Sequence, residues 1–123
     1  MRIVIIYPGM EEITKKLIEN TDICFLLDFY GQLLTEKTRE MLELHFAEDM
    51  SLAEISDQYR ISRQAVHDTI RRGVASLNEY EEKLCLANKF KIQKEYILEA
   101  IIDIDMGDTS TAKEKLINLT QLI

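Results

Sequence analysis

The chain of 123 residues has few of the residues that interrupt regular structure, with one proline and four glycines. An all-β fold joins many short strands through turns, and it would need far more turn-forming residues than these. Hydrophobic residues make up 46% and charged residues 30% of the chain, which is typical of a folded protein rather than a disordered one. The composition therefore predicts an all-α protein, built as one modest domain with a helical extension.

Cysteines and long apolar runs are scarce as well. Cys24 and Cys85 stand alone in apolar stretches, so we expect two buried, reduced thiols rather than a disulfide or a metal-binding pair. No run reaches the ~18–20 apolar residues that span a membrane. The apolar residues 3–7 are also too few for the ~7–15-residue core of a signal peptide. These absences favour a cytoplasmic protein with no membrane segment.

Patterns for catalysis and for metal binding are also missing. Glycines are too few for a phosphate-binding loop, and no serine or cysteine has the context of a nucleophile elbow. His45 and His67 have no cysteine or carboxylate at zinc-ligand spacing. Residues 103–108 with Glu114 resemble a calcium loop, but the glycine is fifth instead of sixth, which favours an acidic turn between helices. We expect no enzyme activity, no metal and no cofactor.

Acidic residues dominate the charge, with 22 acidic and 15 basic side chains and a formal net charge of −7. Acidic residues outnumber basic ones in residues 1–59 and again in residues 73–123. Only the window 60–72 is basic, and a lone basic window on the second helix of a helix-turn-helix is where nucleic-acid binding is expected. The charged residues of this window are Arg60, Arg63, Asp68, Arg71 and Arg72.

Hydroxyl residues at helix starts indicate where the central helices begin. Ser51 with Glu54 three residues later predicts a capping box that opens a short helix, and Ser62 predicts the cap of the next one. Arg60 stands in the turn between them, at a left-handed position that usually takes glycine. Val66 then falls where the second helix must bury a side chain against the first. These spacings predict a helix-turn-helix.

Other helices are predicted on both sides of this motif. Apolar spacing favours one or two helices in residues 10–34, with a break at 20–22, and a further helix capped by Thr35. Apolar residues recur every three or four positions from the second helix of the motif to about Asn88. This spacing predicts that the helix continues to about Asn88 and that a kink follows. The inner residues of this helix are Val66, Ile70, Val74 and Leu77.

The chain accordingly divides into three parts. Residues 10–88 form the helix-turn-helix domain, and residues 89–123 form a C-terminal helical extension. In this extension Gly107 ends one helix, and Thr111 with Glu114 forms a second capping box for the last one. Residues 1–9 are β-like, and we expect them to be an upstream or non-native extension, with Met10 as the native initiator.

The outer face of the second helix carries the candidate contacts. At ~100° per residue, Gln64, Asp68, Arg71 and Arg72 fall opposite the buried residues. Gln64 can read adenine and an arginine can read guanine, whereas Asp68 would repel phosphate unless it accepts from cytosine or pairs with Arg71 or Arg72. Arg63 lies in the first turn, where the helix dipole favours phosphate. The alternative is a surface helix with an aspartate–arginine pair.

Three strings resemble the YlxM family of small bacterial proteins, whose domain is similar to region four of sigma factors. They are residues 34–37 (LTEK), 51–55 (SLAEI) and 62–66 (SRQAV), and residues 28–34 also resemble the family's first helix. The resemblance runs from about Asn20 to Lys83. It implies a cytoplasmic protein that self-associates and is associated with the signal recognition particle pathway. The contact positions that it implies are Ser62, Arg63, Gln64, His67, Asp68 and Arg71.

The motif and the family resemblance together predict two alternative functions. The first is a regulator that reads DNA through the helix at 62–88, with Arg60 and Arg72 on phosphates, and that forms a homodimer. The second is a protein- or RNA-interaction accessory factor of the signal recognition particle, in which the helix-turn-helix is a scaffold. In that case the acidic helices would dock on a basic partner, either the particle's protein or its receptor. A structured RNA lies between the two, because the same arginines would then meet an A-form backbone.

Overall fold

The computed structural model describes residues 22–122, and all the regular structure in that range is helical, which confirms the all-α class. The chain forms two compact units, with unit 1 ending at Lys83 and unit 2 beginning at Leu84. The interpretations of residues 1–9 and of Met10 as initiator lie outside the described residues. Of the break predicted at 20–22, only Asp22 is described, and it is helical.

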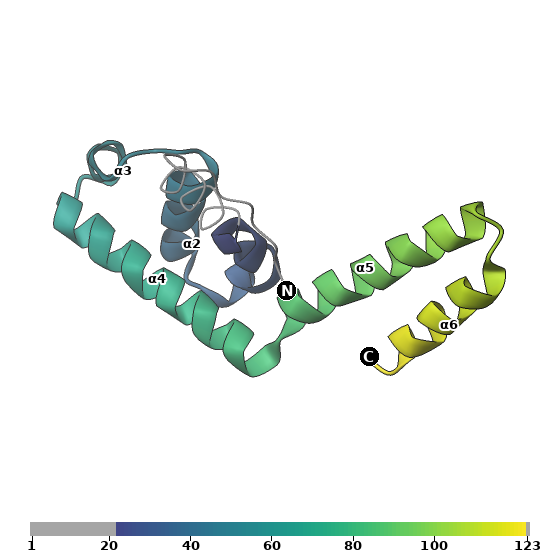
Figure 1. Ribbon diagram of the computed structural model, residues 1–123. Coiled ribbons are helices and arrows are strands. Elements are labelled where there is room, and N and C mark those ends of the chain that lie inside the picture. Colours follow the sequence, from purple (N-terminus) through teal and green to yellow (C-terminus); the bar gives the residue numbers. More distant parts are fainter. Residues whose placement is uncertain (1–21, 123) are drawn as a thin grey trace, which may run out of the picture. The chain divides into compact units, whose positions relative to one another are not determined.

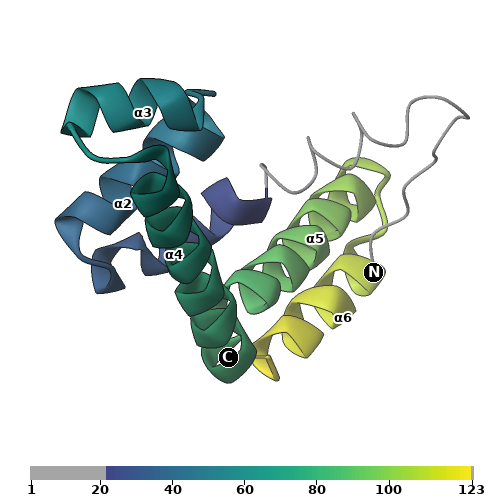
Figure 2. The same cartoon turned by 90° about the vertical axis from the view of Figure 1, so that its left-hand side faces the viewer.

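Unit 1 holds the predicted helix-turn-helix. α3 lies crosswise to the beginning of α4 in both ribbon views, as the two helices of this motif do (Figures 1 and 2). The elements of the unit are a helical segment over residues 22–30, the 3-10 turn η1 (Gly31–Leu33), α2 (Glu36–Leu42), the π-helical turn η2 (Glu43–Ala47), α3 (Leu52–Tyr59) and α4 (Arg63–Leu84).

All three predicted hydroxyl caps of this unit are present. Thr35, Ser51 and Ser62 each accept a hydrogen bond from the backbone N–H three residues later, at 3.3, 3.1 and 3.0 Å. The Ser51 hydroxyl also donates to the Glu54 carboxylate at 3.1 Å, so this pair is joined twice. Each cap provides an acceptor for one N–H that has no partner inside its helix, which is why α2, α3 and α4 begin where they do.

The turn of the helix-turn-helix is made at Arg60. Its backbone is left-handed, with φ 57° and ψ 44°, as predicted from its place in the motif. The next N–H, that of Ile61, donates to the Ser56 carbonyl at 3.2 Å and closes the end of α3. A residue with a side chain at this φ is strained relative to glycine, so the turn forms at some cost in stability.

A second left-handed residue, Asp49, leads from η2 toward α3, with φ 56°. The His45 ring lies half-buried beside this turn, and its Nδ1 is 2.9 Å from the Met50 carbonyl oxygen. Because a carbonyl can only accept, Nδ1 carries the hydrogen and donates it. His45 therefore holds the loop before α3 in place, in addition to its edge-on contact with Phe46 at 4.9 Å between ring centroids.

The inner face of α4 is buried largely as predicted, with Val66 and Leu77 fully covered. Val74 is only half-buried, and Gly73 occupies the buried place beside it. A Cβ at Gly73 would lie 2.8 Å from Cδ1 of Leu42, so α2 can lie this close to α4 only because Gly73 has no side chain. The largest fully buried side chains among the described residues of this unit are Tyr30, Met41, Leu42, Ile55, Val66 and Leu77.

Tyr30 joins the helical segment 22–30 to the far end of α4. Its side chain is 1% exposed, and its hydroxyl donates to Oε1 of Glu81 at 2.6 Å. Its ring centroid lies 6.0 Å from that of Tyr80. A buried tyrosine needs a partner for its hydroxyl, and Glu81 provides one, so this glutamate has a structural role in unit 1.

The 3-4 spacing of apolar residues predicted an end for the motif's second helix that is too late in the chain. α4 ends at Leu84, and Cys85 has a left-handed backbone with φ 56°, so the apolar spacing read through to Asn88 crosses a helix break. The prediction of two buried thiols is also wrong for Cys85, which is exposed, whereas Cys24 is half-buried. Burial and the nearby Asp28 carboxylate raise the pKa of the Cys24 thiol. No disulfide joins Cys24 and Cys85.

Unit 2 is a helical hairpin of α5 (Leu86–Asp105) and α6 (Thr109–Thr120). Ala100 and Ala112 are each 2% exposed, and these small side chains allow the two helices to approach closely. Lys115 of α6 forms an ion pair with Asp103 of α5, with 2.7 Å between Nζ and Oδ2. None of the helices in the described part of the chain is long and apolar enough to cross a membrane.

The turn of this hairpin is acidic, as predicted, but its cap is not the predicted pair. Gly107 ends α5 with φ 82°. Asp108, not Thr111, then caps α6, because its carboxylate accepts from the Thr111 N–H at 3.1 Å and from the Thr111 hydroxyl at 2.6 Å. Glu114 is exposed on α6 and takes no part in the cap. An aspartate one turn earlier offers a charged acceptor at the helix end, which is stronger than a hydroxyl.

Candidate nucleic-acid interface

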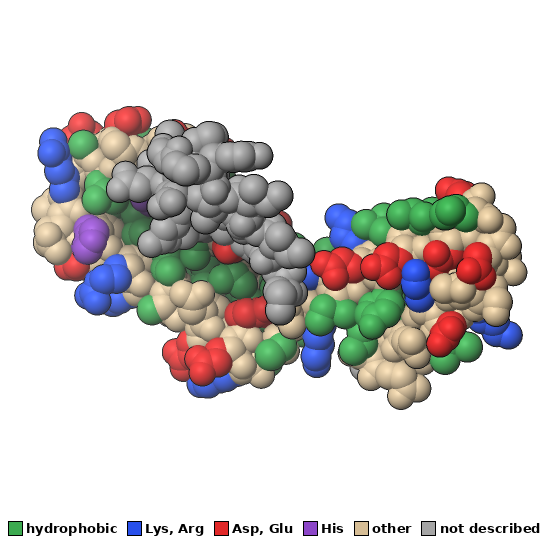
Figure 3. All heavy atoms as spheres, viewed as in Figure 1, with side chains coloured by type: hydrophobic (Ala, Val, Ile, Leu, Met, Phe, Trp, Pro, Cys, Tyr) green, Lys and Arg blue, Asp and Glu red, His purple; other side chains and the backbone are tan. Residues whose placement is uncertain are grey.

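The outer face of α4 presents the predicted contact residues to solvent. Arg63, Gln64, His67 and Arg71 are all exposed, and the helical period places the last three on one side of α4. Basic side chains gather at the end of unit 1 where α4 begins (Figure 3). Arg60 is exposed in the turn just before this face, so its charge lies next to the first turn of the helix.

Ser62 has a structural task at this site. Its hydroxyl oxygen accepts from the Ala65 N–H at 3.0 Å, which leaves its hydrogen to donate to a ligand. The residue stays exposed at the start of α4. Ser62 therefore can contact a phosphate only as a donor while it keeps the cap.

Asp68 lies at the centre of the exposed face, where it contacts neighbours on its own helix. The amide Nε2 of Gln64 donates to its Oδ1 at 3.0 Å, and the Nδ1 atom of His67 lies 3.6 Å from the same oxygen. Arg72 reaches the Asp68 backbone carbonyl instead, with its Nε donating at 3.3 Å. The aspartate–arginine pair of the surface-helix alternative is therefore not formed between these two residues.

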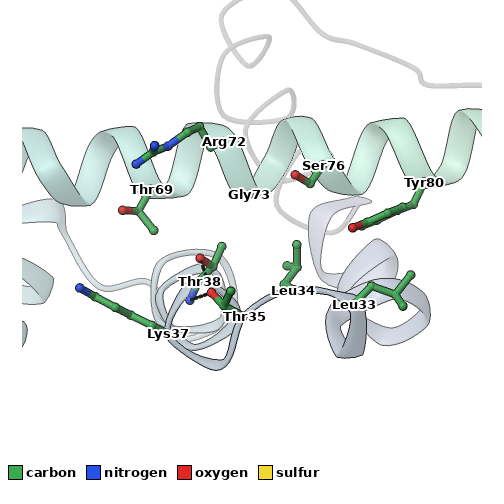
Figure 4. A pocket seen from close by; sticks show the side chains of 10 residues that line it. All are labelled: Leu33, Leu34, Thr35, Lys37, Thr38, Thr69, Arg72, Gly73, Ser76 and Tyr80. Atoms are coloured by element: carbon green, nitrogen blue, oxygen red, sulfur yellow. Dashed lines mark hydrogen bonds between the residues drawn. The ribbon is translucent and has the colours of Figure 1, made fainter.

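Arg72 differs from the other arginines in its surroundings. It lies at the side of α4 that faces α2, where it lines a groove of about 330 Å³ together with Lys37 (Figure 4). Lys37 is not among the residues predicted from the sequence, because residues 37 and 72 belong to different helices and no periodicity connects them. The eight candidate residues thus fall into two sets, with Arg72 apart from the exposed outer face.

An acidic hollow of about 550 Å³ lies elsewhere on unit 1, between η2 and α3. Three of its lining residues are glutamates, namely Glu40, Glu43 and Glu48. The Tyr59 hydroxyl donates to Oε2 of Glu40 at 2.7 Å, and burial together with this carboxylate raises the pKa of Tyr59 to about 12. The acidic surplus is evident in the sequence, but only the fold brings these three glutamates to one hollow.

Metal binding finds no support in residues 22–122, where no group of three or more histidine, cysteine or acidic side chains is placed to hold an ion. Asp103 of the calcium-like string is engaged with Lys115.

Comparison with known proteins gives one consistent family. A family model described as "Putative helix-turn-helix protein, YlxM / p13 like", UPF0122, matches residues 15–119. A UPF0122 protein of Desulforamulus reducens is 45% identical over 94 residues, covering 76% of this chain and 80% of the relative. Another from Bacillus pumilus is 42% identical over 108 residues, covering 86% and 97%.

The UPF0122 protein YlxM of Bacillus subtilis is 47% identical over 79 residues, which cover 64% of this chain and 72% of the relative. The family match includes the whole helix-turn-helix and nearly all of the α5–α6 hairpin. The similarity therefore extends beyond the motif itself, which many unrelated helical proteins share.

Proposed function

Because the chain belongs to the UPF0122 family of YlxM / p13-like helix-turn-helix proteins, we propose that it is a nucleic-acid-binding regulator that reads DNA through α4. The observation that carries this proposal is the exposed face of α4, which presents arginine, amide and imidazole side chains in an otherwise acidic chain. In a helix-turn-helix the N-terminal half of the second helix enters the major groove. Residues on this half of α4 would then meet base edges.

Each residue of this face has a role that its chemistry suits. Arg63 and Arg71 would donate to guanine or phosphate, and Gln64 would read adenine after exchanging its bond to Asp68. Arg60 in the turn would hold a backbone phosphate, which positions the helix without reading sequence. Asp68 would accept from a cytosine amino group, since its carboxylate is not neutralised by Arg72.

We further propose that the protein acts as a homodimer. With so few arginines per chain, the electrostatic contribution to binding is small, and a second copy doubles it. Ile97, Ile101 and Ile104 fall on one side of α5 at helical spacing and are 43%, 49% and 51% exposed. Hydrophobic side chains line one edge of the hairpin (Figure 3). An apolar stripe of this kind on a surface helix supports association.

On the resemblance to the YlxM family, we also propose that this regulator acts in the cytoplasm and belongs to the signal recognition particle pathway. A second candidate function in that pathway is an accessory factor that docks on a basic protein, the particle's own protein or its receptor. The specific observation in its favour is the hollow lined by Glu40, Glu43 and Glu48, whose charge complements a basic surface.

The two functions are separated by matched variants. We expect Arg63→Ala with Arg71→Ala to abolish DNA binding without unfolding the protein, because both arginines are exposed and pack against nothing in the core. Log affinity falls as log salt concentration rises, and each lost phosphate contact should make this slope less steep by about 0.9. The control, Lys94→Ala with Lys113→Ala, makes the same charge change on unit 2. Unchanged affinity in the arginine variant would falsify the assignment.

For the accessory-factor function, charge reversal at Glu43 and Glu48 tests the acidic hollow and leaves the Glu40–Tyr59 bond intact. The control is Glu79→Lys, an exposed glutamate outside the hollow. Loss of the basic partner in the first variant alone supports docking. Normal binding by both variants argues against it.

The nature of the target is decided by crosslinking the protein in its native cell and sequencing the DNA and RNA that are recovered. Discrete promoter DNA supports the regulator, and signal recognition particle RNA supports a factor of the particle that uses the same arginines on RNA. Recovery of neither nucleic acid overturns the DNA-reading proposal and leaves the helix-turn-helix as a scaffold.

A further inference from the structure

The groove between α2 and α4 differs in charge from the rest of the molecule. Its lining contains two basic side chains, several hydroxyls and no acidic residue, although acidic residues outnumber basic ones by 22 to 15 in the chain. A concave surface that excludes carboxylates in so acidic a protein is suited to an anion. The lining residues are Leu33, Leu34, Thr35, Lys37, Thr38, Thr69, Arg72, Gly73, Ser76 and Tyr80.

The two basic side chains lie at one end of the groove and keep their charge available. Arg72 bonds to a backbone carbonyl, at 3.3 Å, and not to a carboxylate. The ion pairs in the described residues do not include Lys37 or Arg72. In the close view both side chains come from facing helices and lie toward the same end of the groove (Figure 4). A guanidinium and an ammonium at the same end of a groove are groups that suit a phosphate.

Hydroxyl groups line the groove from its basic end, where Thr69 lies, to its middle, and they offer both kinds of hydrogen bond (Figure 4). The Thr35 hydroxyl donates to Oγ1 of Thr38 at 2.9 Å, so the Thr38 hydrogen is left to donate to a ligand. The Thr69 hydroxyl donates to the Ala65 carbonyl at 2.9 Å, which leaves its oxygen to accept. Ser76 also points into this region (Figure 4). Mixed donors and acceptors suit the hydroxyls of a sugar.

The opposite end of the groove is apolar and aromatic. Tyr80 points toward the cavity from α4. Leu34, which directly precedes Thr35, points toward the cavity from the opposite side, with Leu33 beside it (Figure 4). The Tyr80 ring is half-buried and is held by its contact with Tyr30 at 6.0 Å between centroids. A fixed aromatic ring with leucines around it is a suitable surface for a planar, weakly polar group.

We propose that this groove binds a nucleoside monophosphate unit. The phosphate lies between Lys37 and Arg72, the sugar contacts the hydroxyls, and the base packs at the Tyr80 end. The volume of about 330 Å³ is at the lower end of the ~300–1,000 Å³ of small-molecule pockets, which suits one nucleotide and not a dinucleotide. The proposal does not depend on DNA reading by the outer face of α4, because Lys37, Ser76 and Tyr80 lie outside that face.

The test is a titration of the full chain with adenosine 5′-monophosphate, followed by amide chemical shifts in nuclear magnetic resonance spectra. Adenosine and inorganic phosphate are titrated separately as half-ligands. We expect shifts at the amides of Thr38 and Ser76, and weaker binding of each half-ligand. Lys37→Glu and Ser76→Leu should weaken binding at least about tenfold, equivalent to ~1.4 kcal/mol. The control Lys94→Glu carries the same charge reversal on unit 2 and should bind normally.

Three results would overturn the proposal. They are equal affinity for adenosine and its monophosphate, shifts that avoid α2 and α4, or unchanged binding by Lys37→Glu in a protein whose thermal unfolding matches the wild type. The source of the nucleotide is then distinguished with a 5′-phosphorylated single-stranded oligonucleotide. Binding of the oligonucleotide at the same amides, with the same Lys37 dependence, assigns the site to a strand end. Binding of the free nucleotide alone assigns it to a small molecule.

Discussion

Replacing Gly73 with alanine is expected to destabilise unit 1, because the added methyl group has no space where α2 packs against Gly73. The new Cβ would lie 2.8 Å from Cδ1 of Leu42 and 2.9 Å from Cγ2 of Thr38. Carbon atoms that are not bonded pack at ~3.5–4.0 Å. Leu42 is fully buried, so its side chain cannot swing away into solvent, and the helices must separate instead.

The size of the effect is a difference between two opposing contributions. Forcing an extra methyl group into a packed core costs ~1–3 kcal/mol. Alanine regains ~1 kcal/mol because it is the better helix former inside α4. We therefore expect a net loss of about 1 kcal/mol in the free energy of unfolding, and no more than about 2 kcal/mol. For a unit of this size, 1 kcal/mol lowers the midpoint temperature by ~4–8 °C.

Urea unfolding followed by circular dichroism measures this loss, and a double-mutant cycle assigns it to the Leu42 contact. Leu42→Val removes the Cδ1 atom, so it should cost less in the Gly73→Ala background than in the wild type. The coupling should be favourable by about 0.5–1 kcal/mol. Additive effects, or a Gly73→Ala protein more stable than the wild type, would refute the close approach of α2 and α4.

Three further perturbations test the turn, a tyrosine and a cap. Arg60→Gly should raise the free energy of unfolding in urea by ~0.5–1 kcal/mol, because removing the strain of a side chain at positive φ outweighs the entropy that glycine loses on folding. Any destabilisation contradicts this. The pKa of Tyr59 rises from 10.0 to about 12 in the folded state, so its hydrogen-bonded proton stabilises the fold below pH 10 and that contribution disappears by about pH 12. The stability gap between wild type and Tyr59→Phe should therefore narrow from pH 9 to pH 12, and a constant gap counts against the Glu40 bond. Hydrogen bonds from Thr111 hold the pKa of Asp108 below 3.8, so Asp108→Ala should lower the melting temperature at pH 7, with the difference closing as the pH falls through that pKa. A difference that persists in acid would mean that the carboxylate is not the cap.

Local features of unit 1 could be predicted from the sequence because they depend on neighbours a few residues apart. Thr35, Ser51 and Ser62 each satisfy an N–H three residues later, so a hydroxyl at the right spacing is enough to predict a helix start. The left-handed turn at Arg60 follows from the fixed length of the motif between two such starts. The family strings lie in this same stretch.

Prediction failed where two local signals competed. Asp108 and Thr111 are both good caps three residues apart, and the choice depends on where Gly107 ends α5. Cys85 carries no sequence signal for a left-handed backbone, so the apolar spacing concealed the end of α4. Both errors moved a helix end by a few residues without changing the fold class.

The sequence alone determined the helical class, the helix-turn-helix and the exposed face of α4, because these depend on hydrogen bonds and periodicity within single helices. Only the tertiary structure showed that Gly73 is the contact point of α2, that Lys37 shares a groove with Arg72, and that three glutamates line one hollow. Gly73 and Leu42, like Lys37 and Arg72, come from different helices far apart in the chain, and Gln58 and Tyr59 of α3 complete the hollow of the glutamates. The formation of such sites depends on how the side chains of two helices interlock, and the spacing of residues along one helix carries no information about its partner.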